Sequence, residues 1–254
     1  MTVLLQVEGL SLRFGGIVAL SDVSFATEAG ELLAIVGPNG AGKTSLLNCV
    51  TGAYRASEGR IVFDGADITS QPAYTAAKRG IARTFQHNEL FPHLTVLENL
   101  LLGRHAFLNY GLLAAGLFWG RCRSWELKQR EKVETFIDFF ELEPYRKLTV
   151  GDLPYGVQKL IGLARAFAAE PRLVLLDEPS AGLNRQEKED LARYLLRARH
   201  EFSPTVIWIE HDMQLVRDLA DKVLVLHYGK ELASGPPHLV LSDPAVIAAY
   251  IGKR

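Results

Sequence analysis

The sequence predicts an α/β protein with a mostly parallel sheet, a smaller antiparallel β part and an inserted helical segment. Three observations support this fold class. Apolar runs alternate with helical patterns in the last third of the chain, a glycine-rich loop joins an apolar run to a helix near the N-terminus, and the middle shows helical periodicity. Strands that alternate with helices form parallel sheets covered by helices on both faces.

The N-terminal third begins with short strands. Four apolar or alternating runs predict them, at residues 3–14, 18–26, 31–36 and 60–68. Gly15 and Gly16 form a turn between the first two runs, and Asp64 with Gly65 forms a hairpin turn in the fourth, which we expect at a sheet edge. The third run, ELLAIV, suits a buried strand, and after the glycine-rich loop the sequence SLLNCVTG predicts a helix.

The segment 90–168 is predicted to be helical. One helix is expected at residues 95–102. Apolar residues at i, i+3, i+4 and i+7 define one face of a helix within residues 126–142 and of another after Gly156. They are Val133, Phe136, Ile137 and Phe140 in the first, and Leu160, Leu163, Ala164 and Phe167 in the second.

The last third returns to alternating strands and helices. Strands are expected for three apolar runs, LVLLDE, TVIWIE and VLVLHY. A helix with Leu191, Tyr194, Leu195 and Ala198 on one face separates the first two runs, and a short helix separates the second from the third. The helical middle segment is therefore expected to be inserted into the sheet domain rather than appended to it.

The composition excludes several classes of protein. The 254 residues are 48% hydrophobic with a net charge of −1, which excludes disorder and argues against nucleic acid as the main partner. Cys49 and Cys122 lack metal-ligand spacing and are expected to be free thiols in a reducing compartment. The N-terminus lacks the features of a secretory signal, and the longest stretch without Asp, Glu, Lys or Arg has 16 residues, too few to span a bilayer. We therefore expect a soluble cytoplasmic protein.

A phosphate-binding loop is the strongest motif. GPNGAGKT fits the pattern G-x-x-x-x-G-K-[ST], follows a predicted strand and opens a predicted helix. Its glycines let backbone N–H groups converge on phosphate oxygens, Lys43 would neutralise the β- and γ-phosphates, and the Thr44 hydroxyl would bind Mg²⁺. The predicted nucleotide-binding residues of the loop are Gly37, Pro38, Asn39, Gly40, Ala41, Gly42, Lys43, Thr44 and Ser45. The alternative is a glycine-rich turn that binds no nucleotide.

Two adjacent carboxylates end the strand LVLLDE. In open α/β sheets, the carboxyl ends of parallel strands face the ligand. Asp177 would hold Mg²⁺, directly or through water, and Glu178 would polarise the attacking water as the general base. Taken alone, such a pair is often a solvated strand end, but the phosphate loop favours the functional interpretation.

A third motif makes a family resemblance specific. The hexapeptide LPYGVQ opens an amphipathic helix. Its first five residues, LPYGV, resemble the LSGGQ signature of ATP-binding-cassette (ABC) transporter ATPases, and Gln158 follows them. Its residues are Leu153, Pro154, Tyr155, Gly156, Val157 and Gln158. The resemblance covers essentially the whole chain, and residues 180–184 match the D-loop of the family.

The resemblance implies roles for three further residues. Phe14 would stack on adenine, Gln86 would contact Mg²⁺ or the water and sense the membrane partner, and His211 would contact the γ-phosphate and position the water. Taken singly, these residues have other interpretations: a core aromatic, a surface amide and a histidine at a strand end.

The resemblance also implies the fold of a single ABC ATP-binding domain over residues 1–254. Residues 1–86 and 169–254 would form a RecA-like P-loop core, and residues 87–168 the inserted helical subdomain that carries the signature. ATP would be sandwiched between the phosphate loop of one subunit and the signature helix of another. Nucleotide would therefore close the dimer, and hydrolysis would open it.

The signature departs from the family at Pro154, which replaces the serine. Proline offers neither a hydroxyl nor an N–H group, although it suits the first turn of a helix. The N–H of Gly156 remains available. We expect this half of the composite site to work with a weaker hold on the γ-phosphate, and a degenerate site is the alternative.

Several segments resemble the importer ATPases for branched-chain amino acids. They are LRFGGIVALSDVSF, GIARTFQHNELFPHLTVLENLLLGRH, the Tyr of LPYG, the apolar insertion at residues 107–119 and the ending DPAVIAAYIG. The insertion is either a buried helical hairpin or a docking surface for a membrane subunit. The last helix carries an apolar face that serves either core packing or a dimer contact. That face consists of Val246, Ile247, Tyr250 and Ile251.

The resemblance implies an ATPase that energises a membrane importer, with ATP and Mg²⁺ as cofactors. Its partners would be a second ABC ATPase subunit, in a heterodimer or a homodimer, two permease subunits and, indirectly, an extracytoplasmic solute-binding protein. It would lie at the cytoplasmic face of the inner membrane.

Three alternatives remain open. The chain could serve a transporter for urea or amides, aromatic acids or lipids, act as a soluble ABC ATPase on ribosomes or DNA, or regulate without hydrolysis. A single phosphate loop and balanced charge argue against the second alternative. The retained Lys43, Glu178 and His211 argue against the third.

Overall fold

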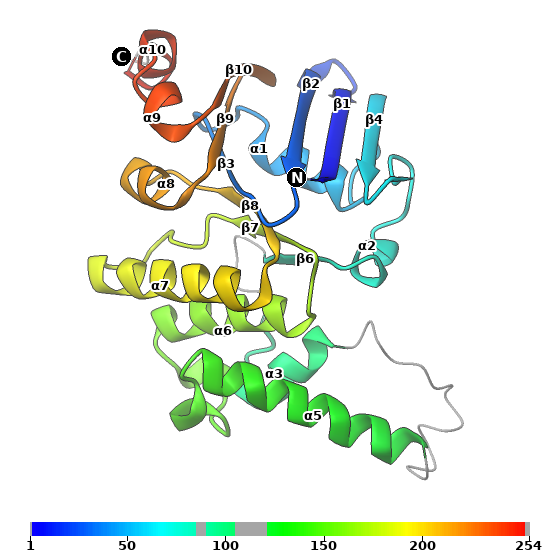
Figure 1. The fold of residues 1–254 in the computed structure, drawn as a ribbon, viewed down its shortest axis with the longest axis vertical. Helices are drawn as coiled ribbons and strands as arrows, with labels where there is room; N and C mark the ends of the chain where they lie inside the picture. The colour runs from blue at the N-terminus through cyan, green and yellow to red at the C-terminus, as the bar shows by residue number, and fades with distance from the viewer. Residues whose placement is uncertain (1, 85–89, 105–120, 252–254) are drawn as a thin grey trace. The chain divides into compact units, whose positions relative to one another are not determined.

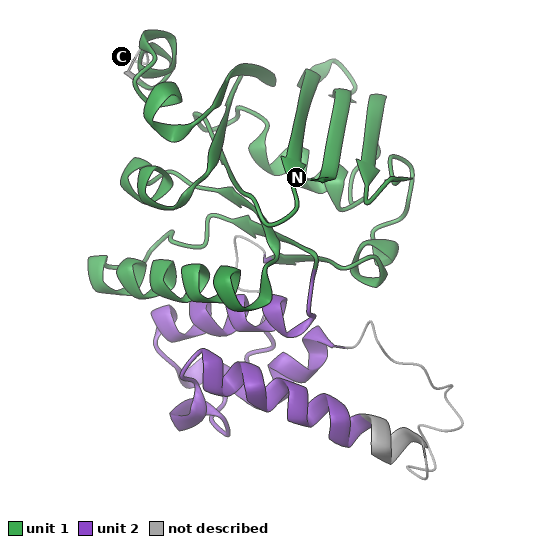
Figure 2. Cartoon of the chain, in the orientation of Figure 1, with its two compact units in different colours: residues 1–83, 172–254 green, residues 84–171 purple. Residues whose placement is uncertain are grey.

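The computed structural model describes residues 2–84, 90–104 and 121–251, and the chain forms two compact units (Figure 2). Unit 1 consists of residues 1–83 and 172–254, and unit 2 consists of residues 84–171. Both ends of the chain therefore contribute to unit 1, and unit 2 interrupts it.

Six strands form the central sheet of unit 1 (Figure 1). In spatial order they are β10 (Lys230–Gly235), β9 (Lys222–His227), β3 (Leu32–Val36), β8 (Thr205–Ile209), β7 (Leu173–Asp177) and β6 (Ile81–Thr84). The pairs β9–β3, β3–β8 and β8–β7 are parallel, whereas β10 pairs antiparallel with β9 at the edge. Every residue of β3, β7 and β8 is buried, in agreement with their largely apolar sequences.

Two strands of this sheet, β6 and β10, are missing from the sequence-based prediction. All residues of β10 are exposed or half-buried, so this edge strand lacks an apolar pattern. In the four-residue strand β6 only Ile81 is fully buried. Neither strand carries the signal by which buried strands are predicted.

Four antiparallel strands form a second sheet in unit 1. Their order is β2 (Ile17–Glu28), β1 (Val3–Phe14), β4 (Glu58–Phe63) and β5 (Ala66–Asp67). The β4–β5 hairpin turns at Asp64 and Gly65, which both have positive φ angles, as the sequence predicts. β5, rather than β4, lies at the edge.

Hydrophobic clusters lie on both faces of the central sheet. Leu33 and Ile35 of β3 belong to a large core that includes the antiparallel sheet and helix α1 (Lys43–Val50). Their neighbours Ala34 and Val36 point the other way, into a cluster with α8 (Met213–Leu219), α9 (Pro237–Val240) and α10 (Pro244–Ile251). Cys49 lies in the large core, and burial raises the pKa of its thiol to about 11.

The helices of unit 1 match the predicted apolar faces in part. In α7 (Arg185–Phe202), all four predicted residues are buried: Leu191, Tyr194, Leu195 and Ala198. In α10, Val246 and Tyr250 pack against the second cluster, but the Ile247 side chain is 42% exposed. Core packing therefore accounts for only part of this face. A short helix, α2 (Tyr74–Lys78), precedes β6.

Unit 2 is helical in its described residues. It contains α3 (Val96–Gly103), α5 (Arg121–Phe139), α6 (Tyr155–Ala168) and two 3-10 turns, Glu143–Tyr145 and Val150–Asp152. The predicted face on α5, which ends with Phe140 just after the helix, is entirely buried. On the predicted face of α6, three of the four residues are buried and Leu160 is half-buried. Periodicity thus predicts which side of each helix faces the core of this unit.

The buried side chain of Arg104 links α3, α5 and α6. It follows α3 and donates hydrogen bonds to the Gln129 side chain on α5 and to the carbonyl of Ala168 at the end of α6. Its guanidinium also pairs with Glu170 at 3.0 Å. A buried guanidinium needs such acceptors because burying a charge without partners is costly.

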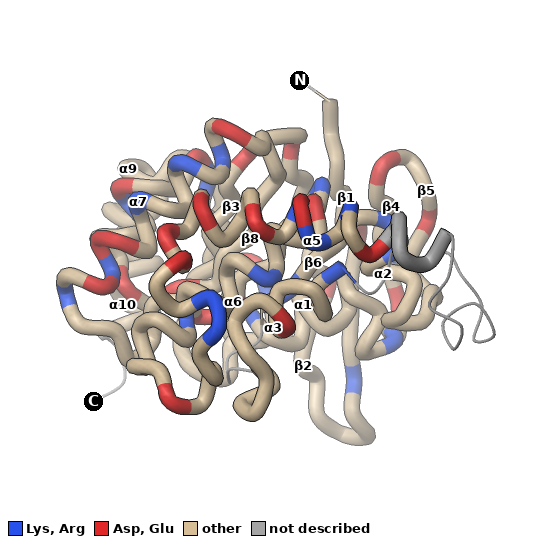
Figure 3. The backbone as a smooth tube through the Cα atoms, turned by 90° about the horizontal axis from the view of Figure 1, so that it is seen from below, with Lys and Arg blue, Asp and Glu red and all other residues tan. Residues whose placement is uncertain are grey.

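Charges of both signs are mixed over the described residues. Lys and Arg are interspersed with Asp and Glu along the backbone (Figure 3), in keeping with the net charge of −1. In the part of the chain that the structure describes, every helix is too short or too polar to cross a membrane.

Candidate active site

The phosphate loop runs from the end of β3 to the start of α1, and its glycines are required by its path. Gly37 and Gly42 have φ angles of 150° and 100°. A Cβ at Gly37 would lie 2.1 Å from the carbonyl oxygen of Leu226, and one at Gly42 would lie 2.6 Å from that of Ala19. Any other residue at either position would clash with neighbouring backbone, so glycine fixes this close approach.

Lys43, the first residue of α1, folds its side chain back over the loop. The buried Nζ donates hydrogen bonds to the carbonyls of Gly37 at 2.7 Å and Pro38 at 3.1 Å. Burial lowers the pKa of Lys43, while the charges of Glu178 and Asp177 act in the opposite direction. The ammonium therefore lies within the electrostatic reach of both carboxylates.

The N-terminus of α1 has no side-chain cap. Its N-cap residue is Gly42, in a left-handed conformation. The first amides of a helix lack intrahelical partners, and their partial positive charge attracts anions. Together with Lys43, this helix start can hold the phosphates of a nucleotide.

Asp177 ends β7 in a buried ion pair. Its Oδ2 lies 2.9 Å from the Arg83 guanidinium, which also donates a hydrogen bond to the Asn48 side chain on α1. Burial raises the pKa of Asp177, and Arg83 acts against this shift. Arg83 thereby connects the end of β7 with the helix that follows the phosphate loop.

Glu178 and His211 lie in contact. The imidazole Nε2 is 2.8 Å from Glu178 Oε1, and because a carboxylate only accepts, the imidazole N–H donates. Glu178 has a φ angle of 50°, in the left-handed region, and its N–H donates to the carbonyl of Ile209 at 3.1 Å. Two residues from different strand ends thus converge at the carboxyl edge of the sheet.

The oxygen donors at this edge fit Mg²⁺. Thr44 offers an exposed hydroxyl and Asp177 a carboxylate. Mg²⁺ prefers oxygen ligands and is usually held by one or two protein groups together with phosphates and water. Among the residues that the structure describes, no cluster of three His, Cys, Asp or Glu could hold a metal ion by itself.

Phe14 lies at the end of β1 and is 46% exposed, so it is not a core aromatic. Its ring packs edge-on against Tyr54, with the centroids 5.2 Å apart and the planes at 81°. The exposed face of such a ring is available to stack on a planar ligand.

The signature residues lie at the start of α6 in unit 2. Pro154 is the N-cap residue of α6, so it lies just before the first helical turn, and no side chain caps the helix. The Gln158 side chain donates to the carbonyl of Leu153 at 2.8 Å, and Lys159 lies over the exposed ring of Tyr155 at 5.5 Å. Gln158 thus fixes the turn that enters the helix.

Two sequence-based predictions fall on residues outside the described ranges. They concern Gln86 and the apolar insertion at residues 107–119. The role of Gln86 therefore stays a prediction, and so does the choice between a buried hairpin and a docking surface for the insertion.

Sequence reasoning misses two residues beside the site, Arg83 and Tyr54. Arg83 lies in the segment GIARTFQ, three residues before Gln86, and the family resemblance implies a role only for the glutamine. Its partner Asp177 is 94 positions away, and Tyr54 meets Phe14 from another segment. Contacts over such separations leave no periodic signal in the sequence.

The chain matches a known family over most of its length. The ABC transporter family matches residues 20–181. The high-affinity branched-chain amino acid transport ATP-binding protein BraF of Pseudomonas aeruginosa is 40% identical over 253 residues, 98% of each chain. LivG of Escherichia coli, which carries the same description, is 36% identical over 250 residues, again 98% of each chain.

Solved structures show the same fold. A nucleotide-free ATP-binding cassette from an ABC transporter has a TM-score of 0.87 and 32% identity, covering 99% of this chain and all of its own. The ADP conformation of MJ1267, an ATP-binding cassette of an ABC transporter, has a TM-score of 0.87 and 33% identity over the full length of both chains.

The chain therefore belongs to the ABC transporter family, as one of its ATP-binding ATPase cassettes. Within that family it is similar over nearly its whole length to ATP-binding proteins of high-affinity branched-chain amino acid transport. The family, the fold class and the ATPase activity predicted from the sequence are confirmed.

Proposed function

We propose that this ATPase powers a membrane importer of branched-chain or related hydrophobic amino acids, and that hydrolysis takes place between the phosphate loop and Glu178. The contact of Glu178 with His211, at 2.8 Å beside the charge of Lys43, is the observation that carries the proposal. The similarity to BraF and LivG supports the class of transported solute.

In this proposal residues 37–45 hold the triphosphate. Backbone amides at the start of α1 bind phosphate oxygens, and Lys43 exchanges its two carbonyl acceptors for the β- and γ-phosphates. The exchange is favourable because a charge-assisted hydrogen bond to phosphate is stronger than one to a neutral carbonyl. The exposed face of Phe14 stacks on the adenine ring.

Mg²⁺ would be held by Thr44 and Asp177, with Gln86 as a further ligand, and when bound it would neutralise charge on the phosphates. Arg83 keeps the Asp177 carboxylate at the end of β7. An arginine that is always protonated prevents the buried carboxylate from being an isolated charge.

Glu178 and His211 act on the attacking water. Transfer of a phosphoryl group to water depends on positioning and charge stabilisation rather than on a covalent intermediate. Glu178 accepts a hydrogen bond from the water and orients it toward the γ-phosphate. His211 donates its Nε2–H at this site and thereby holds the Glu178 carboxylate in place.

The signature residues would complete the site of a second subunit. The uncapped start of α6 presents backbone amides, including that of Gly156, but Pro154 contributes no N–H or hydroxyl. Neither half alone surrounds the γ-phosphate, so nucleotide closes a dimer and hydrolysis opens it. The second subunit is another ABC ATPase, in a heterodimer or a homodimer.

The remaining partners follow from the proposed transport role. Two permease subunits present the solute pathway, and a solute-binding protein delivers the solute on the other side of the membrane. The chain then lies at the cytoplasmic face of the inner membrane, bound through the permeases. Motion passes to them through the Gln86 region and the helical unit.

The experiment that tests this function is ATPase stimulation in the assembled complex. The chain is purified with its membrane partners and cognate binding protein in lipid vesicles, and phosphate release is measured with single solutes. We expect leucine, isoleucine and valine to stimulate hydrolysis. Stimulation by a urea, an amide or an aromatic acid alone, with all three failing, would overturn the proposed solute class.

A complex with Glu178→Gln tests the catalytic role of Glu178, and one with Glu189→Gln is its matched control. The Glu178→Gln complex should bind ATP with unchanged affinity and remain in the closed dimer, because the amide keeps the shape of the side chain but is a poor base. Glu189→Gln on α7, which alters an exposed ion pair with Arg185, should hydrolyse ATP normally. Normal turnover by the Glu178→Gln complex would remove Glu178 from its proposed role.

A further inference from the structure

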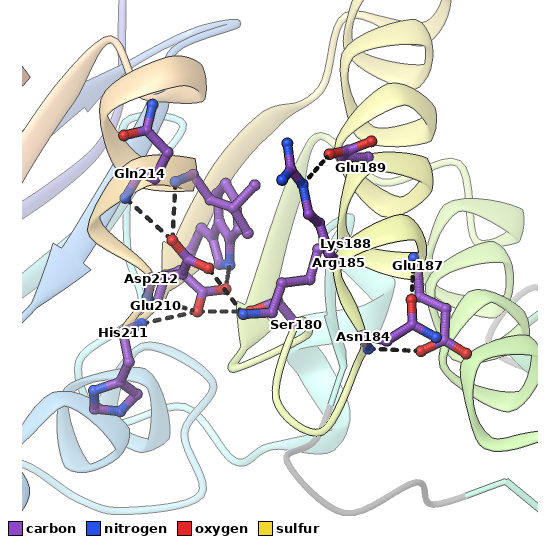
Figure 4. Close-up of polar contacts among 12 residues, drawn as sticks. Ser180, Asn184, Arg185, Glu187, Lys188, Glu189, Glu210, His211, Asp212 and Gln214 are labelled. Carbon is purple, nitrogen blue, oxygen red and sulfur yellow. Dashed lines mark hydrogen bonds and ion pairs between the residues drawn. The ribbon is translucent and has the colours of Figure 1, made fainter.

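Glu210 is a buried carboxylate that the mechanism above does not use. It follows β8, directly precedes His211, and is 2% exposed. Its Oε1 accepts hydrogen bonds from the Ser180 hydroxyl at 2.8 Å and from the backbone N–H groups of His211 at 2.8 Å and Asp212 at 3.2 Å (Figure 4). Its Oε2 accepts one from the indole Nε1–H of Trp208 at 3.0 Å.

The donor set around Glu210 requires a carboxylate. A buried charge is costly unless hydrogen bonds replace its hydration, and here four uncharged donors do so. A carboxylate only accepts, which matches a site in which every one of these neighbours donates. In a glutamine, one of the two oxygens would become an NH₂ group that faces a donor.

Glu210 joins the two loops that carry the reactive side chains. Ser180 lies two residues after Glu178, in the loop that follows β7, and the His211 N–H belongs to the turn that follows β8. Glu178 itself has a left-handed φ angle of 50°, a conformation that non-glycine residues adopt only where their surroundings hold them. The bond from Ser180 to Glu210 supplies part of that hold.

The same turn is anchored from a second side. Asp212 caps α8 by accepting hydrogen bonds from the backbone of Gln214 and Leu215, and its other oxygen lies 2.8 Å from Lys188 on α7 (Figure 4). Lys188 and Asp212 can therefore keep the turn folded when Glu210 is changed. This makes a substitution at Glu210 informative about geometry rather than about folding.

We propose that Glu210 is a positioning residue for ATP hydrolysis, which sets the separation of His211 and Glu178 by holding the loops of both. The inference rests on the proposed roles of those two side chains. It predicts that Glu210 affects the chemical step and leaves nucleotide binding at the phosphate loop unchanged. An error of about 1 Å in the placement of reacting groups can cost up to a hundredfold in rate.

The test compares Glu210→Gln with Glu31→Gln in the full chain. Glu31 also accepts a backbone hydrogen bond, from Glu28, but it precedes β3 at the opposite end of that strand from the phosphate loop. We expect Glu210→Gln to lower kcat by about tenfold or more, with KM and the Kd for MgATP changed less than about twofold. Glu31→Gln should match the unmodified chain.

A spectroscopic signature separates positioning from general damage. The chain has three tryptophans, and Trp208→Phe identifies the indole ¹⁵N–¹H resonance of Trp208. In Glu210→Gln that resonance should shift because its acceptor changes. In the Trp208→Phe background, no indole N–H faces the amide that Glu210→Gln introduces. We therefore expect Glu210→Gln to lower kcat less in that background.

Ser180→Ala keeps the inference testable if Glu210→Gln fails to fold. It removes one donor to Glu210 on the Glu178 side, and kcat should fall severalfold at unchanged nucleotide affinity. His211→Ala is measured alongside. If His211→Ala is inactive while Glu210→Gln and Ser180→Ala retain full kcat, Glu210 is not a positioning residue. If His211→Ala itself turns over normally, the proposed role of His211 is wrong instead.

Discussion

The starts of helices α1 and α6 differ from those of α3 and α7. α3 begins with a capping box in which Thr95 and Glu98 satisfy each other's backbone amides, and α7 begins with the same arrangement of Asn184 and Glu187. The N-cap residues of α1 and α6 are Gly42 and Pro154, and no side chain caps either helix. The capped helices satisfy amides with their own side chains, whereas α1 and α6 leave these amides without a side-chain cap.

The two uncapped starts also differ from each other. α1 brings a buried cation, Lys43, together with its amides, and a Cβ at Gly37 or Gly42 in the loop before it would clash with backbone. α6 brings only its amides and dipole, since Pro154 lacks polar side-chain atoms. In the proposed function, the start of α1 holds phosphate with a charge, and the start of α6 completes the site of a second subunit with amides alone. Substitutions at the first should therefore have the larger effect.

The largest effect is expected for Lys43→Met. Methionine keeps the length of the buried stem but removes the ammonium, which bonds to the carbonyls of Gly37 and Pro38 here and would bind the phosphates in the proposed function. Loss of one preorganised charged donor should lower kcat/KM for MgATP by about a hundredfold or more. Phosphate release and nucleotide titration of the purified chain measure it.

Lys132→Met is the control for Lys43→Met, because it removes only a half-exposed ion pair with Glu170 in unit 2. It should leave turnover unchanged, since such pairs contribute little. If Lys43→Met binds nucleotide as the unmodified chain does, the charge of Lys43 does not contribute to binding. If the unmodified chain shows no saturable binding, residues 37–45 are not a nucleotide-binding loop.

A smaller gain is expected for Pro154→Ser. Serine places a hydroxyl at the N-cap of α6, which has no side-chain cap. In the proposed function this hydroxyl would donate to the γ-phosphate bound by the opposite subunit. One hydrogen bond, at its typical net contribution, should raise kcat/KM of the assembled ATPase by about threefold to tenfold. ATPase assays on the dimer under matched conditions measure this gain.

Pro154→Ala separates the hydroxyl from the loss of the ring. It removes the same pyrrolidine without adding a polar atom, so any effect of a more flexible unfolded chain is common to both variants. If the serine and alanine variants have equal kcat/KM, the start of α6 contributes through its backbone alone.

Sequence patterns predict the parts of this molecule that depend on local order. The buried face of α7 follows from a spacing that any amphipathic helix shows, and the phosphate loop follows from glycines at fixed positions before Lys43. The hairpin at Asp64 and Gly65 follows from turn chemistry. Each of these signals lies within a short stretch of chain.

The parts that sequence patterns miss depend on contacts between distant segments. The bond between Arg83 and Asp177 spans 94 positions and that between Ser180 and Glu210 spans 30. An arginine or a glutamate has many possible partners, and only the folded sheet brings these pairs together. The edge strand β10 is missing from the prediction for a different reason, because its exposed and half-buried residues carry no apolar pattern.

The smallest effect is expected for Thr95→Ala, which turns the capped start of α3 into an uncapped one. The variant loses the two hydrogen bonds that the Thr95 hydroxyl makes with Glu98 and keeps the bond from the backbone N–H. The free energy of unfolding should therefore fall by about 1 kcal/mol in urea titrations at pH 7, with ATPase activity unchanged. The backbone and hydroxyl of Thr95 hold the pKa of Glu98 below its ordinary value. A carboxyl with a depressed folded-state pKa stabilises the fold above its unfolded-state pKa and loses this contribution as the pH falls through the folded-state value. The stability difference between the two proteins should therefore shrink in acid, and a constant difference would mean that Glu98 takes no part in the cap.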